Sequence, residues 1–413
     1  MKVLITFFPI DDMGGIINHH EQLCAGLKEL GHTVETVLLM WRHQAPTSVA
    51  GGRGSIEHSG LEFDQRRGFR WTSANIVPYR GTVRMERWKE YASQFDLIIW
   101  QVAVPTRRKE NRGNTDWIQL YDVPVPQIAV IHDGNFLDSY PWLHVVSKHL
   151  TGLACVHTCA YNSARHIDVP SAMIVNPFNL NETAEISRTE YIQRNPGFLS
   201  VQTWKAWKRV PEIVKAIPYM GNMQKMLAGK GIDYYYLTSK DKNKHPGAWD
   251  SALENGMEYL DVITNAERNS LLRSTPVSLD ASWSKKYGAI GAHFNRVQVE
   301  AILQGAVPVV RDLAIGHEPN DVFRDNYNCL ALPWDATPQE FGHYMREYVN
   351  LPYPQYRVLM DNGWDTVQQF DRKKVAQKFL NLAVGEYDQI GTLSPAVKVD
   401  GYRAILEFFN GNQ

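Results

Sequence analysis

Cysteine, long apolar runs and net charge are all scarce in this chain, and each shortage excludes a class of protein. Four cysteines in 413 residues cannot build a disulfide scaffold, so we expect a protein of the reducing cytoplasm. No stretch approaches the roughly 20 apolar residues of a membrane helix, so we expect no membrane span. The opening MKVLITFF passes directly into a strand-like pattern, so we expect no signal peptide. The formal net charge of −1 excludes binding to nucleic acid through overall charge.

Metal-binding patterns are also sparse. Cys155, His157 and Cys159 lack the second ligand pair of a zinc site, so buried structural cysteines are the favoured interpretation. The chain contains no DxD triplet. We therefore expect no metal and no required cofactor.

Strand and helix patterns alternate along the chain in two series. KVLITFF predicts a strand, INHHEQLCAGLKELG a helix that ends at Gly31, and HTVETVLLM a second strand, which together form a βαβ unit. Further strands are predicted at 96–102, 127–133, 152–158 and 171–177, before a polar linker at 179–196. A second series follows, in which Thr264 and Glu267 have the spacing of a capping box. The pattern predicts two Rossmann-like, doubly wound α/β domains of about 200 residues each, with a helical tail.

Two glycines and a polar pair follow strands of the first series. After the first strand come Gly14 and Gly15, where glycine lets the backbone approach a phosphate or sugar and a helix N-terminus favours an anion. His132 and Asp133 end the strand QIAVIHD, and the carboxyl ends of strands in such sheets face the ligand crevice. An ordinary structural turn is the alternative at both positions.

The second series places charged groups at comparable points. Lys205, Lys208 and Arg209 lie at its first strand-to-helix turn, where cations oppose the helix dipole unless an anion is bound. A diphosphate clamp and a solvated basic turn are the two interpretations. Glu300 lies near the start of an apolar helix and needs hydrogen-bond partners, for which ribose hydroxyls are suitable. A helix-capping Glu is the alternative.

The segment VEAILQGAVPVV resembles the EAxxxGxPV ending found in retaining glycosyltransferases of the GT-B fold. The resemblance extends in order over nearly the whole chain, through the glycine pair, the mid-domain His and the basic turn. It implies two domains that face each other across a cleft. The expected bounds are 1–190 for an acceptor domain, 191–375 for a donor domain and 376–413 for a helical tail that packs back on the N-terminal domain.

The same resemblance assigns roles to residues of the donor domain. Glu300 would hold the donor ribose. Two positions depart from the family pattern, because Ala292 replaces the first Glu of E-x7-E and Ser200 replaces the usual Arg. Three residues are available to substitute for the missing groups: Arg209, Asn295 and Arg296.

Within this fold family, the chain also resembles one branch in further detail, the DNA α-glucosyltransferases of T-even bacteriophages. The similarity rests on His132-Asp133, on the turn Thr203-Trp204-Lys205, and on the segments GIDYYYL and SKKYG. It implies a UDP-sugar donor, DNA with hydroxymethylated pyrimidines as acceptor, and retention of anomeric configuration. His132 and Asp133 would face the sugar and acceptor, and Lys205 would hold the nucleotide.

A basic segment at 53–112 is the independent indication of a DNA acceptor. It holds 12 Lys and Arg against 7 Asp and Glu, with aromatic residues among them. Such a mixture can neutralise phosphates and stack a displaced base. A charged surface loop with its aromatic residues in the core is the alternative, and docking on anionic lipid is another. The candidate acceptor residues are Arg66, Arg67, Arg70, Trp71, Arg84, Arg107 and Arg108.

Two other functions stay open on the sequence. One is a bacterial glycosyltransferase of surface polysaccharide or glycolipid synthesis, for which the basic stretch 84–95 is a candidate membrane-binding helix. The other is a non-catalytic nucleotide-sugar-binding protein, for which Ala292 and Ser200 are the support. We expect a monomer in each case. The sequence does not select the sugar, although UDP-glucose is the default from the resemblance.

Overall fold

The computed structural model describes residues 1–7, 14–38, 70–71, 88–102, 116–132, 140–156, 160–161, 164, 167–202, 208–229, 247–282, 296–312, 322–387, 390 and 393–394. The chain divides into two compact units. Unit 1 comprises 1–179 and 370–413, and unit 2 comprises 180–369. The expected domain bounds at 190 and 375 stay a prediction.

Unit 1 is built on an eight-stranded sheet in the order β14-β7-β6-β5-β4-β1-β2-β3. The pairings are parallel, except that β14 runs antiparallel to β7. Its strands are β1 (Lys2–Phe7), β2 (Thr33–Leu38), β3 (Arg70–Trp71), β4 (Leu97–Val102), β5 (Gln127–Ile131), β6 (Gly152–Cys155), β7 (Ser171–Met173) and β14 (Leu393–Ser394). Its helices include α1 (Gly14–Glu29), η3 (Asp116–Tyr121), α5 (Tyr140–Val146), η5 (Ser147–His149) and α15 (Arg372–Val384).

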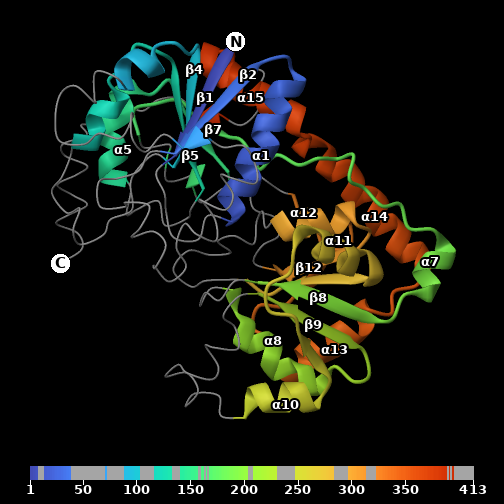
Figure 1. Cartoon of the computed structure of the whole chain (residues 1–413). Helices are drawn as coiled ribbons and strands as arrows, with labels where there is room; N and C mark the ends of the chain where they lie inside the picture. The colour runs from blue at the N-terminus through green and yellow to red at the C-terminus, as the bar shows by residue number, and fades with distance from the viewer. Residues whose placement is uncertain are drawn as a thin grey trace. The chain divides into compact units, whose positions relative to one another are not determined.

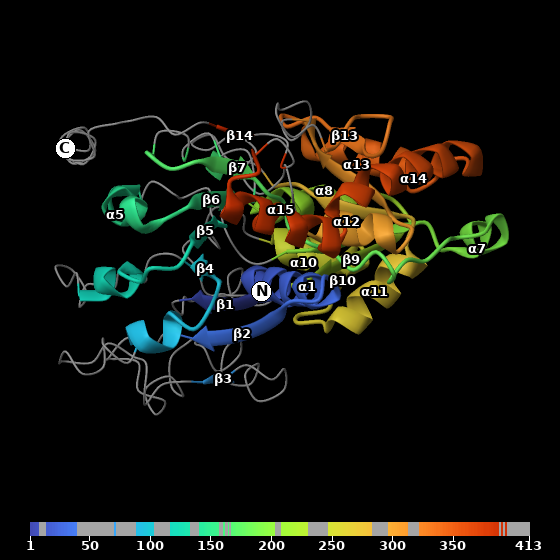
Figure 2. The same ribbon diagram turned by 90° about the horizontal axis from the view of Figure 1, so that it is seen from above.

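The predicted βαβ opening is confirmed. β1 pairs with β2 in parallel, with Lys2 beside Thr33, and α1 connects them. Gly31 follows the helix with a φ of +85°, a left-handed conformation that glycine adopts without steric cost. Helices α1 and α15 cover one face of the sheet and α5 lies on the other (Figure 1, Figure 2).

The core of unit 1 on the α5 face is rich in aromatic residues. Trp88, Trp100 and Tyr121 are fully buried, and the rings of Trp100 and Tyr121 stack at 4.1 Å between centroids. The indole of Trp88 donates a hydrogen bond to the carbonyl oxygen of Leu120 at 2.7 Å. These large side chains fill the space between the sheet and its helical layer, and their polar atoms find partners there.

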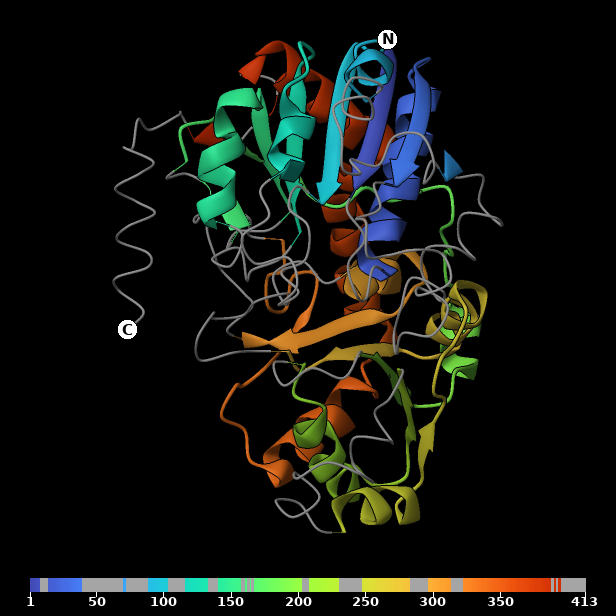
Figure 3. The same ribbon diagram turned by 60° about the vertical axis from the view of Figure 1, so that its left-hand side comes forward.

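Unit 2 carries a six-stranded parallel sheet in the order β10-β9-β8-β11-β12-β13. Helices α11, α12 and α14 lie on one face, and α8, α10 and α13 on the other (Figure 1, Figure 3). The strands are β8 (Gly197–Val201), β9 (Gln224–Ala228), β10 (Met257–Tyr259), β11 (Val277–Asp280), β12 (Val307–Arg311) and β13 (Leu330–Leu332). The helices include α7 (Arg188–Gln193), α8 (Val210–Ala216), η7 (Ile217–Tyr219), α10 (Ala248–Glu254), α11 (Asn265–Ser274), α12 (Arg296–Leu303), α13 (Pro338–Tyr348), α14 (Tyr353–Val367) and η10 (Gln368–Phe370), the last of which reaches into unit 1.

Local capping signals explain where several helices of unit 2 begin. The predicted capping box at the start of α11 is confirmed, because the Thr264 hydroxyl accepts from the Glu267 amide and the Glu267 carboxylate accepts from the Thr264 amide. The same reciprocal pair joins Ser187 and Glu190 at the start of α7. The segment 179–196, expected as a polar linker between the domains, therefore contains the short helix α7.

None of the helices within the described ranges is both long and apolar enough to cross a bilayer.

Candidate functional site

His132 lies directly after β5, at the carboxyl edge of the sheet of unit 1. Its side chain is half-buried, and its Nε2 lies 2.8 Å from Oε1 of Gln101, which is fully buried on β4. This contact ties the imidazole of His132 to the neighbouring strand. The expected position of His132 at a strand end is confirmed, because β5 ends at Ile131.

Two further residues join His132, and the sequence did not single out either one. His19, buried in α1, meets the His132 ring edge to face, with 4.7 Å between ring centroids. Its Nδ1 lies 3.0 Å from Oδ1 of Asn176, which follows β7. The signal was the pair of histidines in the helix after the first strand, where one of two adjacent residues faces the sheet. His19, Gln101, His132 and Asn176 form what we call the unit 1 polar cluster.

The neighbouring His20 has a structural role. Its ring lies 3.4 Å from Cys24 Sγ and 3.2 Å from Thr36 Oγ1. Burial, assisted by Lys28, lowers the pKa of His20 to about 3, and burial raises the pKa of Cys24 to about 12. A neutral imidazole beside a protonated thiol is a packed pair, unsuited to nucleophilic chemistry.

Unit 2 places charged residues around the first turn of α8. Arg209, the residue before α8, has a left-handed φ of +55°, and its Nε lies 3.0 Å from Oε1 of Glu212. The other Glu212 oxygen accepts from Nη2 of Arg311 at 2.5 Å, and Arg311 is buried at the end of β12. Lys208 is buried beside them. One carboxylate between two guanidinium groups leaves positive charge at this helix start, which suits an anion.

Glu300 lies in the second turn of α12 and is buried between two arginines. Its Oε2 lies 3.0 Å from Nη1 of Arg268, and its Oε1 lies 3.6 Å from Nη2 of Arg296. The expectation of a lone carboxylate at the helix start is therefore corrected. Arg268 comes from α11 and was missed by the sequence reasoning, although the capping box had fixed the start of that helix. We call Arg268, Arg296 and Glu300 the arginine–glutamate triad.

Polar residues also gather where β8 and β11 end. Gln202 donates to Oδ1 of Asp280 at 3.1 Å, and the amide of Ser282 donates to the same oxygen at 3.0 Å. Ser200, which stands where the family pattern has an Arg, is buried on β8 and donates to the Leu279 carbonyl at 2.9 Å. Ser200 therefore serves sheet pairing, and positive charge in this unit comes from other residues.

The remaining predicted residues are only partly described. Gly14 and Gly15 are the first two residues of α1, and Arg70 and Trp71 form β3 beside β2. The following lie outside the described residues: Asp133, Lys205, Ala292, Asn295, Arg66, Arg67, Arg84, Arg107 and Arg108.

Part of the basic segment 53–112 belongs to the core of unit 1. Trp88 is fully buried, Ala92 and Phe95 pack in the same cluster, and the Tyr91 hydroxyl donates to Glu35 at 2.6 Å. Trp88 is therefore not available to stack a displaced base. The described end of stretch 84–95 turns its apolar side chains into the protein, which leaves that end no free apolar face for a membrane.

In the described part of the chain, no three or more His, Cys, Asp or Glu side chains gather as metal ligands would. Cys155 is buried on β6, and burial raises the pKa of its thiol well above the usual range. His157 and Cys159 lie outside the described residues.

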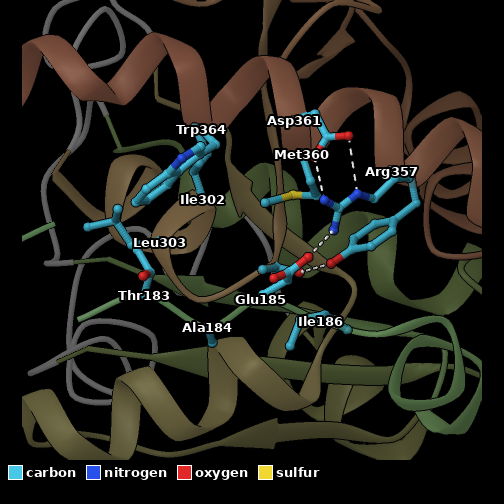
Figure 4. A pocket seen from close by; sticks show the side chains of 12 residues that line it. Thr183, Ala184, Glu185, Ile186, Ile302, Leu303, Arg357, Met360, Asp361 and Trp364 are labelled. Atoms are coloured by element: carbon cyan, nitrogen blue, oxygen red, sulfur yellow. Dashed lines mark hydrogen bonds and ion pairs between the residues drawn. The ribbon is translucent and has the colours of Figure 1, made fainter. Parts of the chain in front are cut away.

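A pocket of about 290 Å³ lies elsewhere in unit 2, against segment 183–186, the end of α12 and the side of α14 (Figure 4). Arg357 at its rim is paired with Glu185 at 3.2 Å and with Asp361 at 2.9 Å. The side chains of Trp364 and Met360 form an apolar part of the pocket wall (Figure 4). None of the candidate site residues lines this pocket, but Ile302, Leu303 and Gly305 of the EAxxxGxPV-like segment do.

Comparison with known proteins finds similarity in the fold. No family model matches the chain, and no curated protein matches its sequence. HepE of Anabaena, solved with UDP-glucose, is 14% identical with a TM-score of 0.65, over 94% of this chain and 100% of that one. An α-glucosyltransferase solved with UDP-glucose and DNA containing an abasic site is 10% identical with a TM-score of 0.63, over 93% and 99%. TarM of S. aureus, solved with UDP and α-GlcNAc-glycerol among its ligands, is 10% identical with a TM-score of 0.61, over 92% and 99%.

The chain has the GT-B fold. The fold class predicted from VEAILQGAVPVV and from the two α/β series is thereby confirmed.

Proposed function

We propose that this protein is a glycosyltransferase that moves a sugar from a UDP-sugar to the hydroxyl of a hydroxymethylated base in DNA, with retention of configuration. The observation that carries the first part is Glu300. It is a buried carboxylate in the EAxxxGxPV-like segment of a GT-B chain, held in place by two arginines. A carboxylate so placed suits the hydroxyls of a donor ribose.

The donor side of the proposal is supported by charge and by the neighbours. Arg209 and Arg311 around Glu212, with Lys208 nearby, give unit 2 positive charge at a helix start. HepE and the α-glucosyltransferase were both solved with UDP-glucose. Lys205 is assigned to the donor by resemblance, and Asn295 and Arg296 are proposed substitutes for the missing family residues. Gly14 and Gly15 complete the proposed set.

The chemistry requires stabilisation of a departing nucleoside diphosphate, because negative charge develops on the leaving phosphate oxygen. Cationic side chains and helix N-termini perform this task in the proposed reaction. The acceptor hydroxyl attacks the anomeric carbon as the bond to the diphosphate breaks, and the acceptor proton passes to the departing phosphate oxygen. His132 and Asp133 position the sugar, and no carboxylate is required as a base.

The DNA acceptor is the finer part of the proposal. It is supported by the segments shared with the bacteriophage enzymes, by the +5 charge of segment 53–112, and by the structural neighbour solved with DNA. The proposed contacts are Arg66, Arg67, Arg70, Trp71, Arg84, Arg107 and Arg108.

A surface glycan is the second candidate acceptor. TarM was solved with α-GlcNAc-glycerol, and its TM-score is close to that of the neighbour solved with DNA. The described end of stretch 84–95 weighs against the membrane-bound form of this alternative, because Trp88, Ala92 and Phe95 are buried.

Transfer from radiolabelled UDP-glucose tests the proposal, with a parallel panel of other UDP-sugars. The acceptors are duplex DNA containing 5-hydroxymethylated pyrimidines and, as control, unmodified DNA. We expect label on the modified duplex alone, with the α-anomer in the product by NMR. Donor hydrolysis without transfer to any DNA would move the acceptor to a glycan or lipid. Failure to bind or hydrolyse any UDP-sugar would contradict the proposal that this protein is a glycosyltransferase.

A further inference from the structure

The arginine–glutamate triad contains a residue from outside the α12 segment that first drew attention to it. Arg296 and Glu300 are one turn apart on α12, whereas Arg268 reaches Glu300 from α11. The side chains of Arg268 and Glu300 are 13% and 10% exposed. An ion pair this far from water adds little net stability, because its burial costs nearly as much as its attraction returns.

Arg268 is itself fixed by residues of its own helix. Its Nη1 donates to Oδ1 of Asn265 at 3.3 Å, and its Nη2 donates to Oδ1 of Asn269 at 3.1 Å. The guanidinium plane is therefore set before it meets Glu300. A planar, clamped cation defines the direction of a carboxylate more closely than a flexible ammonium group does.

The Glu300 carboxylate retains acceptor capacity in this arrangement. Arg268 Nη1 lies 3.0 Å from Oε2, yet among the described residues no donor has the geometry of a hydrogen bond to that oxygen. A buried carboxylate oxygen without a hydrogen bond is costly and indicates a ligand donor. Each carboxylate oxygen carries two lone pairs, so Oε1 and Oε2 can each accept from one of two neighbouring hydroxyl groups, as in a ribose cis-diol.

We propose that Arg268 is a positioning residue that holds the Glu300 carboxylate to accept both hydroxyls of a ribose. Through it, the site selects ribonucleoside over 2′-deoxyribonucleoside diphosphates. This inference rests on the proposed function, since it takes the donor nucleotide as the ligand of Glu300. Selection follows because a ligand without the 2′-hydroxyl leaves a buried acceptor unpaired, and sites built to hydrogen-bond a hydroxyl reject analogues that lack it.

Calorimetric titration of UDP and 2′-deoxy-UDP on the full-length protein measures this selectivity. We expect wild type to prefer UDP by roughly 10- to 100-fold, and Arg268→Gln to bring the ratio of the two dissociation constants close to 1. Arg268→Lys keeps the charge without the planar fork, and we expect an intermediate ratio. Arg273→Gln is the matched control, because Arg273 lies on the same helix, 55% exposed, in a loose 3.9 Å pair with Glu190.

The outcomes separate the inference from the function beneath it. Wild type that binds UDP and 2′-deoxy-UDP equally would overturn the inference and leave the glycosyltransferase intact. A ratio that stays at the wild-type value in both Arg268 variants would reduce Arg268 to a structural ion pair. If the wild-type protein binds neither UDP nor 2′-deoxy-UDP, the proposed function is contradicted as well. Circular dichroism shows whether each variant is folded. If Arg268→Gln is not folded, the ratio of the two dissociation constants in Arg268→Lys tests the inference.

Discussion

The two units share an architecture but place different chemistry at the carboxyl edges of their strands. In unit 1 the polar cluster is built from imidazole and amide groups: His19, Gln101, His132 and Asn176. In unit 2 it consists of ions, with Arg268 and Arg296 around Glu300 and with Arg209 and Arg311 around Glu212. Uncharged donors and acceptors suit the hydroxyl groups of a sugar, whereas cations suit a diphosphate and a carboxylate suits ribose hydroxyls.

The two units also differ in the free energy that it costs to bury these polar groups on folding. The neutral cluster of unit 1 needs hydrogen bonds but no counter-ions, so its cost of burial is small when every partner is present. The ions of unit 2 are paired before any ligand arrives, because a buried charge without a partner costs several kcal/mol. A nucleotide can then bind to a prepared set of charges.

The largest expected effect concerns His132. We expect His132→Ala to lower the rate of sugar transfer by about 100-fold or more, because loss of a positioned imidazole misplaces the reacting sugar. UDP binding, which we propose to arise from the ions of unit 2, should change less than about threefold. Single-turnover transfer and equilibrium binding of UDP measure the two effects separately.

His149→Ala is the control for this comparison, since His149 is a partly exposed histidine of unit 1 on η5, just before the amino end of β6. It should transfer sugar at the wild-type rate. Equal rates for His132→Ala and wild type would break the assignment of sugar chemistry to unit 1.

The second effect is a pH dependence of stability that arises from His20 in unit 1. Burial lowers the pKa of His20 to about 3, whereas an unfolded His titrates near 6.5. Below pH 6.5 the unfolded chain binds a proton at His20, whereas the native state keeps this imidazole neutral. The stability contributed by His20 is therefore complete above pH 6.5 and is lost as the pH falls toward 3.

At pH 5 this loss amounts to about 2 kcal/mol relative to pH 7. Denaturant unfolding of wild type and His20→Gln across pH 4.5–7.5 isolates it, because the variant has no imidazole at this position and other titrating groups cancel in the difference. Parallel curves for the two proteins would show that the native state accommodates a charged His20.

The sequence predicted the parts of this molecule that depend on local pattern. The βαβ opening, Gly31 and the Thr264–Glu267 capping box follow from periodicity and turn chemistry, and each is present. The helix α7 carried the same kind of signal in Ser187 and Glu190, but its polar composition suggested a linker. Capping geometry proved to be the stronger indicator.

Candidate site residues could be proposed from the sequence only where one continuous segment carries a pattern. Glu300 was proposed because the segment around it has a recognisable pattern. Arg268 and Gln101 were not found, because each reaches its partner from another element, 32 and 31 residues away in the sequence. Such pairs are set by helix packing and strand order, which a single sequence does not encode in any local window.

The smallest expected effect compares equivalent glycines in the two units. Gly31 follows α1 and Gly305 follows α12, with φ angles of +85° and +77°, so alanine is strained at both positions by about 1 kcal/mol. The surroundings differ, because a Cβ at Gly31 meets nothing within 4 Å, whereas a Cβ at Gly305 collides with Ile186 and approaches Arg194 Nη2 at 3.2 Å.

Gly305 is further constrained because its carbonyl accepts from Arg194 at 2.6 Å and from the Tyr356 hydroxyl at 2.9 Å, so the backbone cannot move aside freely. We therefore expect Gly305→Ala to lower the free energy of unfolding by about 1 kcal/mol more than Gly31→Ala does. Denaturant unfolding of both variants under identical conditions measures the difference. Equal losses would mean that segment 183–186 yields to the new methyl group, and that unit 2 is held less tightly around α12 than its buried ion pairs imply.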